Sequence, residues 1–121
     1  MIELTLSWPP SVNTIWRHVT IGRSARTLLS KDGRQFFEVA SLEVLQQRAG
    51  RRVTGRAGVE IILHAPNRRA YDIDNRAKAI LDALTKGGAW DDDSQLDILI
   101  INRGDITPGG QAVVKLWKLE G

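Results

Sequence analysis

Six aspartates lie between positions 72 and 93 of a chain that is otherwise basic. Asp72 and Asp74 are two positions apart, so in an extended segment their side chains leave the same face, close enough to share one cation. Three more aspartates follow at positions 91 to 93. Carboxylate oxygens are the ligands that hard divalent cations prefer. The spacing therefore predicts an oxygen-ligand metal site.

The third ligand of this site can be chosen by chain reach. A helix predicted from Asn75 to Lys86 carries the chain about 18 Å away from the first pair. The residues that follow, up to Asp93, span at most roughly 23 Å when extended. Asp93 can therefore return to the pair, whereas Asp91 and Asp92 fall short. We predict Asp72, Asp74 and Asp93 as the ligands.

The other residue types indicate which cation the carboxylates would bind. They also indicate which basic side chain would neutralise the carboxylates when no cation is bound. The chain has no cysteine, and its two histidines are isolated, which favours Mg²⁺, with Mn²⁺ as a substitute, over zinc. Without metal, the carboxylates are expected to draw in Lys78 or Arg69 as a counter-charge. Lys78 lies one helical turn after Asp74 and can reach a phosphate held there; the alternative is an ordinary surface ion pair.

The first half of the chain is predicted to hold a strand, a polar loop and an amphipathic helix. Residues 3–8 alternate in part between polar and apolar, which predicts a half-buried strand that ends at two prolines. Residues 11–30 are mostly polar and predict a loop, with at most a short strand at 27–29. Ser30 is the predicted N-cap of a helix over 31–48, where apolar residues recur every three or four positions.

The second half is predicted to hold a central strand, the helix that carries the carboxylates, and two further strands. Residues 59–63 are strongly apolar, which predicts a strand in the middle of the sheet. Asp72 or Asp74 is the predicted cap of the helix over 75–86, which stops at two glycines. The last two predicted strands, joined by a turn into a C-terminal hairpin, cover 96–102 and 111–119.

These elements predict an α/β (α+β) fold in one domain, residues 1–121, with two main helices packed on one face of a mixed sheet. No stretch approaches the roughly 20 apolar residues that cross a membrane, and no signal-like segment opens the chain, so we expect a cytoplasmic protein. The absence of cysteine fits a reducing compartment. No glycine-rich phosphate loop occurs, and no nucleotide cofactor is expected.

Charge is distributed unevenly along the chain, whose formal net charge is +3. Residues 1–71 hold eleven Lys and Arg against five Asp and Glu, while residues 72–121 hold six against nine. A basic surface beside an acidic pocket suits a polyanion that is gripped and processed on metal. Trp16, between basic residues, is the tryptophan best suited to stack on a base. The predicted phosphate contacts are Arg17, Arg23, Arg26, Arg51, Arg52, Arg68, Arg69 and Lys78.

Three motifs in order give the chain a resemblance to a known family. They are Trp-Pro-Pro-Ser-Val-Asn at 8–13, Asp-Ile-Asp-Asn at 72–75 with Lys78 and the stretch 82–87, and Trp-x-Asp-Asp at 90–93. Together they cover nearly the whole chain, and they resemble the RusA family of Holliday junction resolvases.

The resemblance implies a Mg²⁺-dependent endodeoxyribonuclease of bacteria and their prophages that acts in DNA recombination and repair. It implies a homodimer that nicks two opposed strands of a four-way junction. It carries Asp72, Asp74 and Asp93 over as the catalytic, metal-binding carboxylates, and Lys78 as a residue needed for activity. Two alternatives stay open. One is a non-catalytic nucleic-acid-binding module in which the carboxylates cap a helix and order a turn, and the other is a metal-dependent nuclease for flaps or other DNA.

Overall fold

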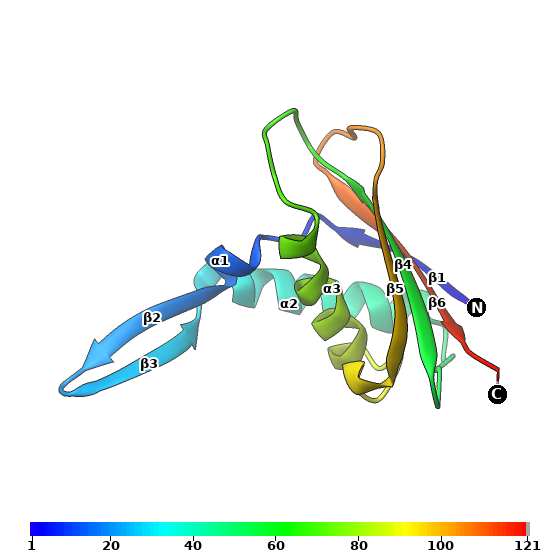
Figure 1. Ribbon diagram of the computed structural model, residues 1–121, viewed down its shortest axis with the longest axis horizontal. Helices are drawn as coiled ribbons and strands as arrows, with labels where there is room; N and C mark the ends of the chain where they lie inside the picture. The colour runs from blue at the N-terminus through cyan, green and yellow to red at the C-terminus, as the bar shows by residue number, and fades with distance from the viewer. Residues whose placement is uncertain (121) are drawn as a thin grey trace.

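The computed structural model describes residues 1–120, apart from the side chains of five residues in the segment 17–26. Four strands form the main sheet, and two more form a separate hairpin (Figure 1). The main-sheet strands are β1 (Ile2–Ser7), β4 (Ala57–His64), β5 (Leu96–Arg103) and β6 (Gln111–Lys118). The hairpin strands are β2 (Trp16–Ile21) and β3 (Ser24–Leu29). The helices are α1 (Val12–Ile15), α2 (Lys31–Gln47), α3 (Asp74–Lys86) and the 3₁₀ turn η1 (Asp93–Gln95).

The main sheet is mixed and has the order β1-β6-β4-β5. β6 runs antiparallel to both of its neighbours, whereas β4 and β5 are parallel and are connected through α3. β4 lies inside the sheet, as its apolar sequence predicts. The mixed sheet with helices confirms the predicted α+β class.

The core lies between one face of this sheet and the two long helices, α2 and α3, which are in contact and cross each other in Figure 1. Leu4, Val114 and Ile61 are neighbours across three strands and are buried, because alternate residues of a strand point to the same face. Val44 of α2 and Ile80 of α3 complete the same cluster. The predicted packing of two helices on one face of the sheet is therefore confirmed.

The two long helices begin in different ways. The Ser30 hydroxyl accepts a hydrogen bond from the Gly33 amide at 3.0 Å, which confirms the predicted N-cap of α2. In α3 the N-cap position belongs to Ile73, and no side chain caps the helix. The prediction that Asp72 or Asp74 is the cap was therefore wrong. Both carboxylates are instead exposed at the start of α3.

Residues 16–29, predicted mostly as a loop, form the β2–β3 hairpin, which projects from the body of the protein (Figure 1). Its two-residue turn contains Gly22, whose φ of 62° suits a tight hairpin turn. The strands pair only with each other, and none of the hairpin side chains that the structure describes belongs to the main core. A segment with little buried surface lacks the apolar alternation that reveals strands.

Both strands predicted near the C-terminus are present, but they do not pair with each other as a simple hairpin would. β4 lies between β5 and β6 in the sheet. The connection through α3 places β5 parallel to β4 on one side, which leaves the other side of β4 for β6. The segment 104–110 therefore carries the chain across the end of β4.

The two edges of the main sheet differ. Along β1, the Gln47 side chain accepts from the Thr5 amide at 2.7 Å and donates to the Thr5 carbonyl at 2.8 Å. The Glu43 carboxylate accepts from the Ser7 amide at 3.0 Å. Side chains of α2 therefore cover this edge, while β5 forms the opposite edge. Within the described part of the chain, no helix is long and apolar enough to cross a membrane.

Candidate active site

The loop between β4 and α3 brings the first two predicted ligands to the start of the helix. Asp72 is exposed and accepts a hydrogen bond from the Asn75 side chain at 3.4 Å. Asp74 is the first residue of α3 and is also exposed. The amides in the first turn of a helix carry partial positive charge, which stabilises carboxylates placed there. This end of α3 therefore tolerates two negative charges close together.

One helical turn further along, Lys78 joins α3 to the returning loop. Its ammonium donates to the Asp93 carboxylate and pairs with Asp82 at 3.0 Å. The hydrogen bond with Asp93 is the main cause that raises the pKa of Lys78, and Asp82 adds to it. The expected recruitment of Lys78 as a counter-charge is confirmed. Lys78 thus links Asp93 of the returning loop to Asp82 on α3.

The loop that carries Asp93 is fixed by buried anchors. Trp90 is 0% exposed, and its indole N–H donates to the Thr85 hydroxyl at 2.8 Å. The Gln95 side chain accepts from the Asp91 and Asp92 amides and donates to the Gly55 carbonyl at 2.8 Å. The position of the loop is therefore set by packing and by backbone hydrogen bonds rather than by the carboxylates.

The other two aspartates of this loop have structural partners. The Asp92 side chain accepts from the Ser94 amide at 3.2 Å and caps η1, and its hydrogen bonds with Ser94 lower the pKa of Asp92. Asp91 forms an ion pair with Arg52. Of the three, Asp93 is the one whose carboxylate hydrogen-bonds Lys78.

The structure does not gather the three predicted ligands: Asp72 and Asp74 lie at the start of α3, whereas Asp93 begins η1, which Figure 1 shows near the other end of that helix. Among the residues that the structure describes, no three Asp, Glu, His or Cys side chains are close enough to hold a metal ion together. Instead, the Lys78 ammonium lies against Asp93. The donor set is chemically suited to a hard divalent cation, since all three are exposed or half-exposed carboxylates. Their role as shared ligands stays a prediction.

A cavity of about 400 Å³ opens beside the Lys78–Asp93 pair. It lies between the base of the hairpin and α3, and it contains one aromatic ring singled out from the sequence, that of Trp16. The lining residues are Trp16, Leu29, Phe37, Lys78, Asp82, Thr85, Lys86, Asp92 and Asp93. A basic group, carboxylates and an exposed indole therefore share one hollow.

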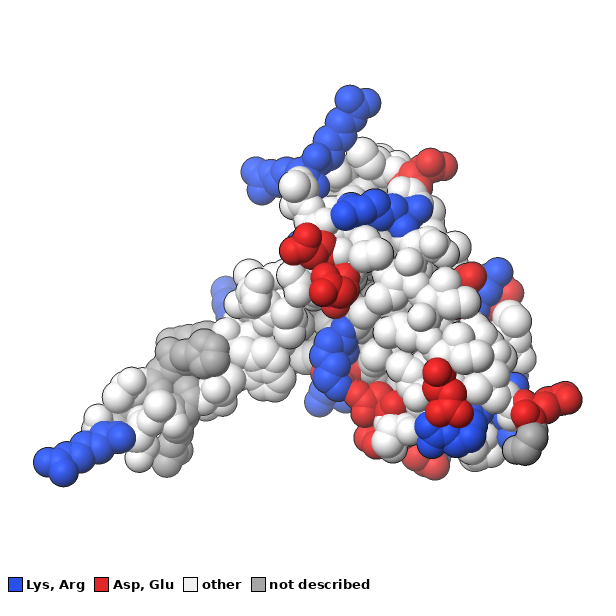
Figure 2. All heavy atoms as spheres, viewed as in Figure 1, with Lys and Arg blue, Asp and Glu red and all other residues white. Residues whose placement is uncertain are grey.

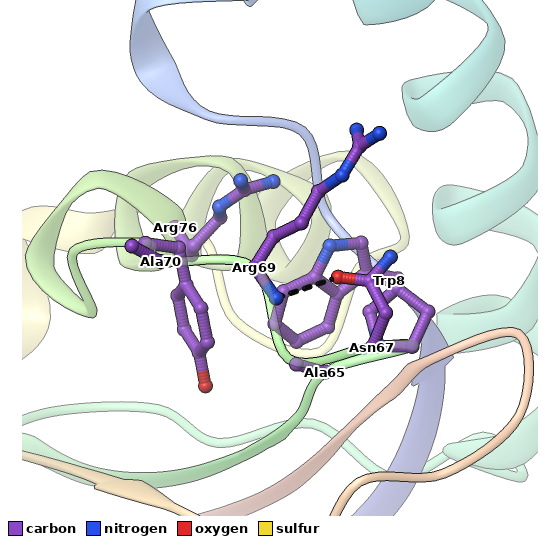
Figure 3. A pocket seen from close by; sticks show the side chains of 8 residues that line it. Trp8, Ala65, Asn67, Arg69, Ala70 and Arg76 are labelled. Carbon is purple, nitrogen blue, oxygen red and sulfur yellow. Dashed lines mark hydrogen bonds between the residues drawn. The ribbon is translucent and has the colours of Figure 1, made fainter.

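A second, smaller pocket of about 210 Å³ lies on the loop that precedes Asp72 (Figure 3). Trp8 meets Tyr71 edge to face, with ring centroids 5.3 Å apart. The Arg76 guanidinium lies 5.2 Å from the Trp8 ring and donates to the Pro9 carbonyl at 2.6 Å. Burial lowers the pKa of Arg76. The Trp-Pro-Pro motif and the carboxylate motif are thus joined by direct contact.

Arg76 is the site-supporting residue that sequence reasoning missed. It lies two residues after Asp74, and its importance depends on Trp8 and Pro9, which are far away in the sequence. The available signal was weak: a basic residue inside the carboxylate motif, which resembles an ordinary solvent-exposed residue of a helix.

The predicted phosphate-binding arginines fall into three groups. Arg68 and Arg69 are exposed on the loop before α3, where Figure 2 shows basic side chains next to the carboxylates at the start of that helix. Arg23 is exposed at the tip of the hairpin. Arg52 pairs with Asp91, and Arg51 donates to the Met1 carbonyl at 3.2 Å. The side chains of Arg17 and Arg26 lie outside the described residues. DNA contact by all seven stays a prediction.

The fold and the site define a small α+β protein in which exposed carboxylates lie beside basic side chains, an arrangement suited to chemistry on a phosphodiester. The family model described as Endodeoxyribonuclease RusA matches residues 7–116. The chain therefore belongs to the RusA family of endodeoxyribonucleases.

Curated relatives agree with this family. The chain is 30% identical over 118 residues to the crossover junction endodeoxyribonuclease rusA of Enterobacteria phage HK97, covering 98% of this chain and 95% of the relative. It is 33% identical over 117 residues to the proteins named crossover junction endodeoxyribonuclease RusA from Shigella sonnei (strain Ss046) and Escherichia coli (strain K12). These two alignments each cover 97% of this chain and 94% of the relative. The predicted resemblance is confirmed.

Proposed function

We propose that this protein is a divalent-metal-dependent endodeoxyribonuclease that resolves four-way DNA junctions by paired symmetric nicks, in recombination and repair. The observation that carries the proposal is the Lys78–Asp93 pair, whose lysine lies one helical turn after Asp74. Candidate cation-binding carboxylates and a candidate phosphate-binding cation thus lie along α3 and the loop that returns beside it. Family membership over 7–116 and the names of the curated relatives support the same activity.

The proposed cation is Mg²⁺, with Mn²⁺ able to substitute, because every candidate donor is a carboxylate oxygen. Asp72, Asp74 and Asp93 would hold it. When bound, such a cation stabilises the negative charge that develops on the phosphoryl oxygens during hydrolysis.

Lys78 is placed to act both when the site is empty and when cation and substrate are bound. Its ammonium contacts Asp82 as well as Asp93, so the Asp82 contact can hold it in place when the Asp93 carboxylate turns to another partner. An ammonium held there is available to bind the scissile phosphate and to offset charge on it. We infer that Lys78 exchanges Asp93 for the substrate phosphate.

Two opposed nicks require two sites related by symmetry, and a two-fold homodimer provides them. We infer a homodimer on a four-way junction, acting in the cytoplasm of bacteria or of phage-infected cells. Phage and bacterial relatives support this setting.

One cleavage experiment tests the activity. End-labelled four-way junction, flap and linear duplex are each incubated with Mg²⁺ and wild type, Asp74→Asn or Asp105→Asn; the last removes an exposed carboxylate from the 104–110 connection. Paired symmetric nicks are expected on the junction only, lost in Asp74→Asn and kept in Asp105→Asn. Equal cutting of the flap would favour the broader nuclease, and junction binding without cutting would favour a non-catalytic module.

The cation site has its own readout in thermal unfolding. Mg²⁺ is expected to raise the melting temperature of wild type and to leave that of Asp72→Asn/Asp74→Asn unchanged, because ligand binding to the folded state adds to stability. If Mg²⁺ shifts both proteins equally, it does not bind at these carboxylates.

A further inference from the structure

Trp16 differs from the other tryptophans in its surroundings. Trp90 is buried, Trp8 packs against Tyr71 and Arg76, and Trp117 lies against Gly58. The Trp16 side chain is 43% exposed, and it makes no ring contact with the residues that the structure describes. Its ring is therefore available to pack against a flat partner, and Trp side chains combine a large apolar surface with a polar N–H.

The indole is a shared wall of two cavities. One is the cavity of about 400 Å³ that also contains Lys78 and Asp93. The other, of about 350 Å³, is formed with Val12, Asn13 and Thr27 on the hairpin side. Trp16 therefore stands at the border between the catalytic hollow and the projecting hairpin.

The backbone at Trp16 is firmly held. The Ser30 amide donates to the Ile15 carbonyl at 2.6 Å, and the Ser30 hydroxyl donates to the Thr14 carbonyl at 2.6 Å. Gly33 packs so closely that an added Cβ would lie 2.8 Å from the Ile15 carbonyl oxygen. The base of the hairpin is thus fixed to the start of α2. With the backbone held, only the side-chain torsions of Trp16 need to be ordered when the ring binds a flat partner.

We propose that Trp16 is a stacking platform for an unpaired or unstacked nucleobase next to the phosphate bound by Lys78. The proposal deepens the proposed function and rests on it. Base pairs inside linear duplex have both faces covered by their neighbours, whereas the branch point of a junction interrupts stacking and exposes base faces. An aromatic platform accepts any base through its π face. Trp16 therefore distinguishes branched DNA from duplex at the binding step, and the carboxylate site acts on the DNA that is bound.

DNA binding measured without divalent cation tests the stacking role of Trp16 separately from cleavage. Affinities are measured for a four-way junction and for linear duplex of equal length, with wild type, Trp16→Ala, Trp16→Tyr and Leu28→Ala. Trp16→Ala is expected to weaken junction binding roughly 5- to 150-fold, the range for losing one base–aromatic stack, with little change for duplex. Trp16→Tyr keeps a ring and should retain most of the affinity. Leu28→Ala, which truncates a 45% exposed side chain on the same hairpin, should match wild type.

A fluorescent base gives a second readout. With 2-aminopurine at the branch point, emission at saturating protein should differ between wild type and Trp16→Ala, while the same base placed within an arm shows no difference. Equal loss of affinity for junction and duplex, or unchanged emission and affinity in Trp16→Ala, would overturn the proposal.

Different results would overturn the stacking role of Trp16 and the proposed nuclease function. If Trp16→Ala binds and nicks junctions as wild type does, only the stacking role falls. If wild type binds no junction at all, the proposed function fails and the stacking role falls with it. Melting temperatures of the four proteins establish that each variant is folded.

Discussion

At the residue scale, one lysine organises the candidate site. Lys78 contacts carboxylates from its own helix and from the returning loop, at Asp82 and Asp93. Without a cation, this ammonium relieves the repulsion between Asp93 of the loop and Asp82 of α3. Under the proposed function, the same ammonium would bind the substrate phosphate when a cation takes its place at Asp93. We therefore expect Lys78 to matter for chemistry more than for metal binding.

Replacing Lys78 tests this division. Lys78→Met keeps a side chain of similar length and removes the charge, so nicking of a junction should fall by roughly 10² or more, the effect typical of removing one charge-stabilising donor. The Mg²⁺-induced rise in melting temperature should persist, because Asp93 loses a competitor.

The matched control is Lys86→Met, which removes a second cation from the same cavity. Lys86 lies over the Phe37 ring at 5.3 Å, whereas the ammonium that pairs with Asp93 is that of Lys78, so the Lys86 variant should nick at nearly the wild-type rate. Normal nicking by Lys78→Met would show that the lysine serves only as a surface ion pair.

The sequence was informative about this site where chain geometry limited the choices. The reach of the chain singled out Asp93, and the structure gives Asp91 and Asp92 other partners. Side-chain pairing across long sequence separations could not be derived in the same way. The packing of Arg76 on Trp8 is the clearest case, because nothing local to either residue indicates the other.

At the element scale, the site depends on the close packing of α3 against α2. Gly87, at the end of α3, approaches α2 so closely that an added Cβ would overlap Val44 and lie 2.8 Å from the Ser41 carbonyl oxygen. The backbone φ of Gly87 is −85°, a value open to any residue. The requirement for glycine here is therefore one of space rather than of conformation.

Gly87→Ala should accordingly destabilise the protein by about 1–3 kcal/mol, the usual cost of overpacking a well-filled interior. Urea unfolding followed by far-ultraviolet circular dichroism measures this. Gly50→Ala is the matched control: its φ is 77° and no neighbouring atom lies within 4 Å of the added Cβ, so only backbone strain of about 1 kcal/mol is expected. A smaller loss in Gly87→Ala than in Gly50→Ala would show that the helices separate readily.

Elements with a buried face were predictable, and the others were not. The apolar run of β4 and the Ser30 cap of α2 follow from local patterns that the structure confirms. No described side chain of the β2–β3 hairpin belongs to the main core, and of its strands only a short segment over 27–29 was predicted. The order of the sheet was also hidden, since which strand lies beside β4 depends on the path of α3 and not on either strand's own sequence.

At the scale of the whole molecule, charge is arranged to bring a polyanion to an acidic site. Basic side chains on the loop before α3 stand next to the carboxylates at the helix start (Figure 2). Under the proposed function, a phosphate backbone attracted to the loop would be delivered to the site, where a bound cation would offset the carboxylates. Arg68 and Arg69 are the arginines on that loop.

Their contribution should appear in the salt dependence of binding. The logarithm of junction affinity should fall linearly with the logarithm of salt concentration, and Arg68→Ala/Arg69→Ala should reduce the slope by about 1.8, or about 0.9 for each phosphate that is no longer neutralised. Lys115→Ala/Lys118→Ala removes equal charge from β6 and should change the slope much less. Equal changes in the two variants would mean that only total charge matters.

The side chains that cover the edge of β1 limit how copies of this protein can associate through their sheets at high concentration. A sheet polymerises by strand addition only if both of its edges accept a new strand. Here Gln47 and Glu43 already occupy the Thr5 amide and carbonyl and the Ser7 amide of β1, which leaves β5 as the edge open to a new strand. Growth of that sheet therefore stops once two copies meet. Two side chains of α2 thus block strand addition at β1 and protect this protein against fibre formation.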